Sequence, residues 1–198
     1  MKTRRKTRTW AVAALVAASG CAGEAANAET EAAVTAELSG TSLEFQNLRR
    51  TLEIAHGKFN QLAEAMPEGS YAWQPMDGVR SVGDVYQHIA ADNYFVPSLM
   101  GMTAPEGTGI TDDVMTFRAF QEIDMTKTEI VGHVNASFEF MLASMDATSE
   151  ELDRAVVLGS SDTTVGDVWI RAITHLHEHL GQSIAYARSH EVVPPWSM

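Results

Sequence analysis

The chain has 198 residues, of which 45% are hydrophobic and 20% are charged, a composition typical of one soluble domain with a sizeable core. Its 26 acidic residues outnumber its 14 basic residues, so the formal net charge is −12. Beyond the first eight residues there is no basic patch or arginine-rich run. Nucleic acid is therefore not an expected partner, because phosphate binding needs concentrated positive charge.

Residues 1–28 have the layout of an export signal followed by the start of a spacer. A basic stretch precedes an apolar run, residues 10–18, that is too short to cross a bilayer. Two cleavage sites compete: Ala26-Asn27-Ala28 has the small-x-small pattern, and Ala18-Ser19-Gly20-Cys21 resembles a bacterial lipoprotein box. Lipidation of Cys21 would account for the chain's one cysteine. We predict a periplasmic or extracytoplasmic protein that touches a membrane only through this anchor; the alternative is a basic tail on a cytosolic protein.

The folded part is predicted to follow a flexible spacer over residues 29–41 and to occupy residues 42–198. Apolar residues at helical spacing predict a long helix over 42–66, which Pro67 and Gly69 end. A second helix is predicted over 82–100. The stretch 101–116 is rich in Gly, Thr, Pro and Asp, and it predicts a long connection.

The second half of the chain predicts two more helices. A third begins near residue 117 or 124 and ends near 146, an extended link follows over 155–161, and a fourth helix starts after Thr163 or Thr164 and reaches Ser189. No stretch alternates like a sheet strand over a useful length. Four such helices, with connections too long for simple hairpins, predict an all-α four-helix bundle with crossover connections.

The fourth predicted helix carries an unusual concentration of histidine. His175 and His179 are one turn apart and share a helix face, to which Gln182 returns, whereas His177 points to the opposite side. Two neutral imidazoles so placed can bind one metal ion. The alternative is a pair of polar residues on a solvated face.

A short internal repeat connects this helix with the second one. Ser81-Val82-Gly83-Asp84-Val85-Tyr86 recurs as Thr164-Val165-Gly166-Asp167-Val168-Trp169, and both copies have the spacing of a capping box. If the two helices run side by side in the same sense, His88 faces the His175/His179 pair. Asp92 lies one turn after His88 and is a candidate fourth ligand or hydrogen-bond acceptor for a ligand histidine; a solvated acid is the alternative.

These residues resemble the DinB-like (YfiT-like) superfamily of bacterial metalloproteins. The resemblance covers residues 42–196 and rests on Trp73, on Ser81-Val82 before His88, on His175-x-x-x-His179 with Gly181-Gln182, and on the ending Tyr186-Ala187-Arg188 with Val193-Pro194-Pro195-Trp196. It implies a four-helix bundle, often a homodimer, with a divalent metal bound by His88, His175 and His179. Many members have an arginine where this chain has Leu180, which weakens an inference about an anionic substrate or a particular thiol cofactor.

The resemblance implies thiol transfer or thiol-dependent isomerisation, and export makes hydrolysis comparatively more favourable. Three histidines leave a coordination position open, as catalytic sites do, and they suit zinc, nickel or iron. We therefore expect a metal-dependent hydrolase or thiol transferase acting on a small molecule. Gln182 is a candidate to orient a ligand; the alternative is that it caps a polar pocket. The alternative is a non-catalytic metal-binding or interaction module of the cell envelope. Glu53-x-x-His56 matches only half of a di-iron motif.

Overall fold

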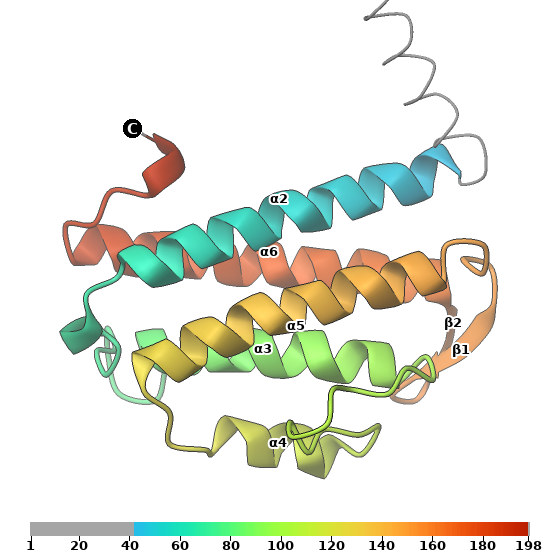
Figure 1. Cartoon of the computed structure of the whole chain (residues 1–198), viewed down its shortest axis with the longest axis horizontal. Coiled ribbons are helices and arrows are strands. Elements are labelled where there is room, and N and C mark those ends of the chain that lie inside the picture. The colour runs from blue at the N-terminus through green and yellow to red at the C-terminus, as the bar shows by residue number, and fades with distance from the viewer. Residues whose placement is uncertain (1–41, 198) are drawn as a thin grey trace, which may run out of the picture. The chain divides into compact units, whose positions relative to one another are not determined.

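The structure is a computed structural model that describes residues 42–197. The predicted export signal, the lipidation candidate Cys21 and the predicted spacer lie outside the described residues. Four long helices account for most of the fold: α2 (Leu43–Ala65), α3 (Val82–Ser98), α5 (Lys127–Ala147) and α6 (Val165–Ser189) (Figure 1). Two short 3-10 helices, η1 (Glu68–Ser70) and η2 (Pro195–Ser197), follow α2 and α6.

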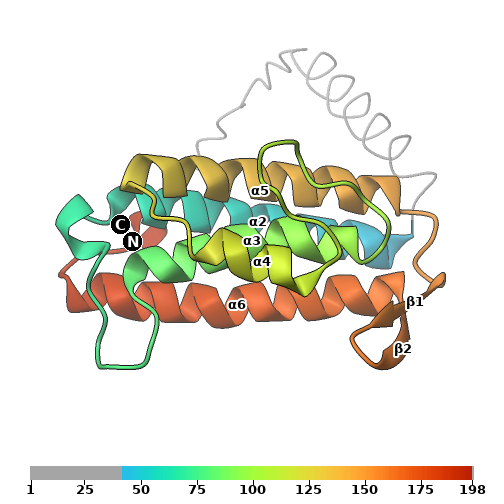
Figure 2. The same ribbon diagram turned by 90° about the horizontal axis from the view of Figure 1, so that it is seen from below.

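The four long helices form a bundle in which two of the three sequence-consecutive pairs do not pack against each other. Helix α2 packs against α5 and α6, and α3 packs against the same two helices. Helices α2 and α3 therefore lie across one diagonal of the bundle and α5 and α6 across the other, whereas the long segment between α3 and α5 connects two adjacent helices (Figures 1 and 2). The predicted all-α four-helix bundle with crossover connections is confirmed.

Two predicted segments differ from the structure. The third helical region is divided into a short helix, α4 (Val114–Gln121), and α5, whose start is close to the later of the two predicted positions. Thr126 and Glu129 form a reciprocal capping box that begins α5. The predicted extended link is instead an antiparallel hairpin of β1 (Ala155–Leu158) and β2 (Ser161–Thr164). Strands of four residues are too short to show alternation in the sequence.

The core of the bundle contains large aromatic side chains that are fully buried among aliphatic ones. Tyr86 of α3 and Trp169 of α6 occupy equivalent places in the repeat and are 1% and 0% exposed. The Trp169 indole donates a hydrogen bond to Thr148 Oγ1 over 3.0 Å, which satisfies its one buried donor. A smaller apolar cluster, which includes Tyr94 of α3 and Phe120 of α4, attaches α4 to the outer side of α3. This attachment places the last turn of α4 beside His88 (Figure 2).

The internal repeat has a common backbone structure. Ser81 caps α3 with a complete capping box, and Thr164 accepts a hydrogen bond from the Asp167 N–H at the start of α6. In both copies the glycine N–H donates to a carbonyl of the preceding segment, Gly83 to Tyr71 O (2.8 Å) and Gly166 to Leu152 O (2.9 Å). The repeat therefore fixes two helix starts against the segments that lead into them.

None of the helices that the structure describes is long and apolar enough to span a membrane.

Candidate metal centre

The candidate site lies between the facing sides of α3 and α6. Near one end of this contact, the Tyr186 hydroxyl donates to Arg80 O over 3.1 Å; further along, Asp92 contacts His175. Residue numbers thus fall along α6 as they rise along α3, and the two helices are antiparallel (Figure 2). The same-sense arrangement assumed from the repeat is wrong. His88 nevertheless faces the pair on α6, because both lie near the middle of their helices.

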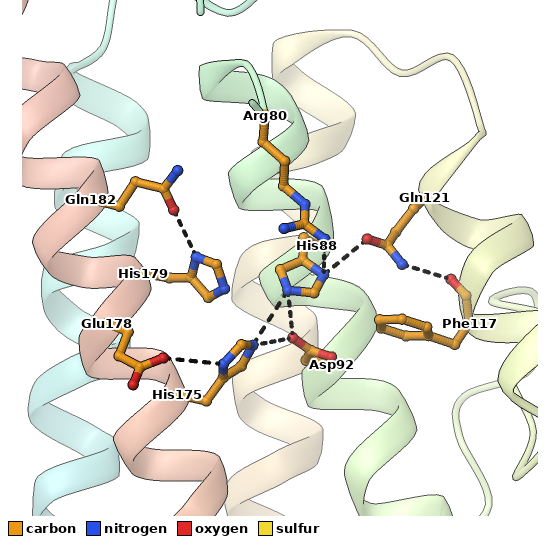
Figure 3. A network of polar contacts seen from close by, with 9 residues as sticks. All are labelled: Arg80, His88, Asp92, Phe117, Gln121, His175, Glu178, His179 and Gln182. Carbon is orange, nitrogen blue, oxygen red and sulfur yellow. Dashed lines mark hydrogen bonds and ion pairs between the residues drawn. The ribbon is translucent and has the colours of Figure 1, made fainter. Parts of the chain in front are cut away.

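The three histidine rings converge on one point (Figure 3). One ring nitrogen from each of His88, His175 and His179 lies within 4.8 Å of the others. The Nε2 atoms of His88 and His175 are 3.3 Å apart. Two nitrogens that share a tetrahedral zinc at about 2.0–2.1 Å lie roughly 3.4 Å from each other. The spacing of this pair therefore fits one ion without movement of the helices.

Each ring has an acceptor on the side away from the common point. His88 Nδ1 donates to Gln121 Oε1 and His179 Nδ1 donates to Gln182 Oε1, both over 2.9 Å. Glu178 Oε2 lies 3.7 Å from His175 Nδ1. Acceptors at Nδ1 favour the tautomer whose Nε2 carries a free lone pair, and such partners also fix the ring orientation. The donor set fits a divalent metal for this reason.

Asp92 lies on the inner side of the site, not at its periphery. Its Oδ2 atom is 3.1 Å from His88 Nε2 and 3.0 Å from His175 Nε2 (Figure 3). The carboxylate thus contacts the same nitrogens that converge, and it can bind an ion there or accept a proton from a ring when no ion is bound. A turn of α3 places it under His88, as the sequence spacing indicated.

The environment divides the three histidines by pKa. Burial lowers the pKa of His88 to about 4 and also lowers the pKa of His179. The hydrogen bond to Asp92 raises the pKa of His175, against the opposing effect of its partial burial. His88 and His179 are therefore neutral near pH 7, as metal ligands must be, whereas His175 is the ring that holds a proton most readily.

Three residues of this site were not identified from the sequence. Gln121 contacts His88 from α4, and no local sequence pattern indicates that α4 packs against α3. Glu178 lies three residues after His175 on α6, and its carboxylate is 3.7 Å from His175 Nδ1. Arg80 precedes the N-cap of α3 and extends toward His88, with its Nη2 atom 3.4 Å from His88 Nδ1. An arginine two turns before a candidate ligand was the available signal for this last residue.

Other histidines considered from the sequence lie elsewhere. His177 is exposed on the far side of α6, where its Nδ1 donates to Ile173 O over 2.8 Å. His56 bonds Asn135 Oδ1 over 3.0 Å, and its neighbour Glu53 pairs with Arg49. In the part of the chain that the structure describes, no carboxylate cluster completes a di-iron site around His56.

A helical bundle with crossover connections and a three-histidine centre defines the class of protein. The profile of the DinB superfamily matches residues 51–183, and the chain belongs to this superfamily. A DinB-like protein from Bacillus cereus is similar in structure, with a TM-score of 0.64 at 12% identity over 76% of this chain and 95% of that one. The DinB-like protein YjoA from Bacillus subtilis has a TM-score of 0.58 at 20% identity, over 74% and 94%. No curated protein matches the chain.

Proposed function

We propose that this protein is a metal-dependent enzyme, a hydrolase or thiol transferase acting on a small molecule. His88, His175 and His179 would bind one divalent ion, zinc, nickel or iron, and Asp92 would complete or support the set. The ion would supply Lewis acidity, which lowers the pKa of a bound water or thiol. The fixed Nδ1 partners Gln121 and Gln182 keep two of the rings directed at the common point, so little reorganisation is needed on binding.

The observation that favours an enzyme over a non-catalytic module is an apolar cavity beside the three histidines. It has a volume of about 160 Å³, and Asp92 and His175 form part of its wall, next to Val96, Val168 and Leu176. A site that serves only to hold a metal needs no such space. Small-molecule sites, in contrast, combine apolar walls with a few convergent polar groups.

The metal-binding part of the proposal is tested by elemental analysis of the purified full-length protein. We expect about one divalent ion per chain, and we expect His175→Ala to abolish it, because two histidines hold a divalent ion far more weakly than three. His177→Ala is the matched control, since this exposed histidine lies on the same helix and points away from the site. Full metal occupancy in His175→Ala would overturn the assigned site.

The catalytic part needs a separate measurement. Wild-type protein, stripped of metal and then reloaded with zinc, nickel or iron, is assayed on model esters and amides and on thiol transfer to an electrophile. We expect turnover that requires both the ion and His175. Stoichiometric metal without turnover on any of these substrates would favour the alternative, a metal-binding module of the cell envelope.

Export and lipid anchoring form an independent part of the proposal, supported by the sequence of residues 1–28. We expect the protein expressed in a bacterial host to fractionate with the envelope and to incorporate radiolabelled fatty acid. Cys21→Ser should prevent labelling, because it removes the acceptor thiol. A protein that stays in the cytosol at full length would contradict this part and leave the metal site unaffected.

A further inference from the structure

The three-histidine centre lies between two hollows of opposite character. On one side is a polar hollow of about 570 Å³, whose lining includes Arg80 and Gln182. On the other side is the apolar cavity of about 160 Å³ that reaches Asp92 and His175. Arg80 and Gln182 each contact one of the histidines, so both hollows border the same centre (Figure 3). A molecule that reached from one hollow to the other would therefore pass the three histidines.

Arg80 has no charged partner that accounts for its position. Among the described residues, no carboxylate oxygen lies within 4.0 Å of its guanidinium, although the chain has 26 acidic residues. Its neighbour His88 Nδ1 already donates to Gln121 and has no lone pair to offer. Asp84 also lines the polar hollow, but its carboxylate accepts the Ser81 N–H at the start of α3.

A guanidinium without a carboxylate partner is suited to bind an anion. Its planar array of donors matches a carboxylate in a bidentate arrangement, and it stays charged at every physiological pH. The Nη2 atom of Arg80 lies 3.4 Å from His88 Nδ1, so the guanidinium is next to one of the three histidines. An anionic group bound to Arg80 would thus lie directly beside the centre.

The apolar cavity determines what the other end of the molecule can be. Its volume is close to that of an engineered cavity of about 150 Å³ that accepts benzene. The rise of α3 places Asp92 roughly 6 Å and Val96 roughly 12 Å beyond His88. Because Asp92 is the first residue of the cavity wall after His88, an occupant of both hollows would carry one compact apolar group, no larger than a phenyl ring, roughly 6 Å from its anionic group.

We propose that the substrate is a small carboxylate with one compact apolar group, with the carboxylate bound by Arg80 and the apolar group in the cavity bounded by Val96, Val168 and Leu176. This proposal rests on the proposed function, since it places the reacting bond between these two ends, at the three histidines. It names Arg80 as a binding residue. The acidic surface of the protein would otherwise repel such an anion.

The test compares the affinities of three probes for the full-length, zinc-loaded protein by calorimetry: phenylpropionate, its neutral amide, and acetate. We expect phenylpropionate to bind at least about tenfold more tightly than either of the others, because only it uses both hollows. Arg80→Gln should remove the preference for the carboxylate over the amide. Arg50→Gln, at an exposed arginine of α2, is the matched control and should leave it unchanged.

The cavity is tested by filling it. Ala172→Phe and Val96→Phe both place a ring in the cavity, and either should reduce phenylpropionate binding to the level of acetate. Using two positions, with helical circular dichroism as a check, guards against one variant that fails to fold. Unchanged phenylpropionate binding in both folded variants would overturn the cavity assignment.

Elemental analysis of the same samples separates this proposal from the proposed function. A carboxylate preference that survives Arg80→Gln in protein holding its metal would overturn the role of Arg80, because the ion alone would then hold the anion. The other outcome is a protein that contains no metal after zinc loading but still prefers the carboxylate over the amide, and loses this preference in Arg80→Gln. That result would support the anion site and overturn the metal-dependent function.

Discussion

Asp92 is the residue with the most contacts to the convergent nitrogens, and it acts on His175 and His88 in different ways. Its hydrogen bond raises the pKa of His175, while burial keeps the pKa of His88 at about 4 despite the same carboxylate. The difference follows from exposure: the side chain of His88 is 8% exposed and that of His175 is 43% exposed. Burial makes the charged form of a ring less favourable, so the same carboxylate of Asp92 leaves His175 readily protonated and His88 neutral.

We therefore predict that Asp92→Asn changes the site in two measurable ways. In metal-free protein, the pKa of His175 should fall toward its ordinary value, because the amide cannot stabilise the protonated ring as a carboxylate does. Metal affinity at high pH should fall by about 10–100-fold, the usual cost of removing a residue that binds or orients a ligand. Proton NMR titration of the histidines and metal competition assays measure the two effects; an unchanged pKa of His175 would contradict the contact.

At the scale of elements, the repeat predicted the helix starts well, but it carried no information on direction. Ser81 and Thr164 do cap α3 and α6, since local spacing determines a cap. The relative direction of the two helices depends on the bundle topology, which the long crossover through α4 decides. Gln121 was missed for the same reason, because its approach to His88 depends on how α4 packs and not on any nearby residue.

The glycines of the repeat provide a test of the helix starts. A Cβ at Gly166 would lie 3.2 Å from Leu152 O, the carbonyl that the Gly166 N–H itself contacts, so Gly166→Ala should force these segments apart. Gly132, an exposed residue in the first half of α5, has nothing within 4 Å of its added Cβ. Gly132→Ala should raise the free energy of unfolding by about 0.5–1 kcal/mol through helix propensity.

For Gly166→Ala we expect the opposite sign, a loss of about 1 kcal/mol, because the close contact outweighs the gain in propensity. Urea denaturation of both variants measures the difference. A stabilisation at Gly166 equal to that at Gly132 would show that the segment around Leu152 moves away at little cost, and that packing does not require glycine at this position of the repeat.

At the scale of the whole molecule, the candidate centre joins two helices that are far apart in sequence. His88 belongs to α3, and His175 and His179 belong to α6, so an ion bound by all three would cross-link the bundle beside an open cavity. The sequence indicated the three ligands through their spacing and the family resemblance. For Arg80 it offered only the position of an arginine before His88, and it could not show the apolar cavity, which forms only when α3, α5, α6 and the β1–β2 hairpin pack together.

This cross-link predicts a pH-dependent stabilisation by metal. An ion that binds only the folded state raises the free energy of unfolding by about 4 kcal/mol when present at a thousand times its dissociation constant. All three rings must be neutral to bind it. Because the pKa of His175 is raised, protons compete for this ring first as the pH falls. We expect zinc to raise the Tm clearly at about pH 8, and the gain to disappear by about pH 5.

The metal-free protein provides the baseline for this measurement, and its own pH dependence has a defined sign. The pKa values of His88 and His179 are lower in the folded than in the unfolded state. Their contribution to the free energy of unfolding is therefore lost as the pH falls below the ordinary histidine range, and for His88 this loss continues to about pH 4. The raised pKa of His175 works in the opposite direction. Thermal unfolding with zinc and with a chelator across this range isolates the metal contribution. His175→Ala should show no zinc-dependent gain at any pH, and a gain in wild-type protein that persists at about pH 5 would contradict ligation by these three histidines.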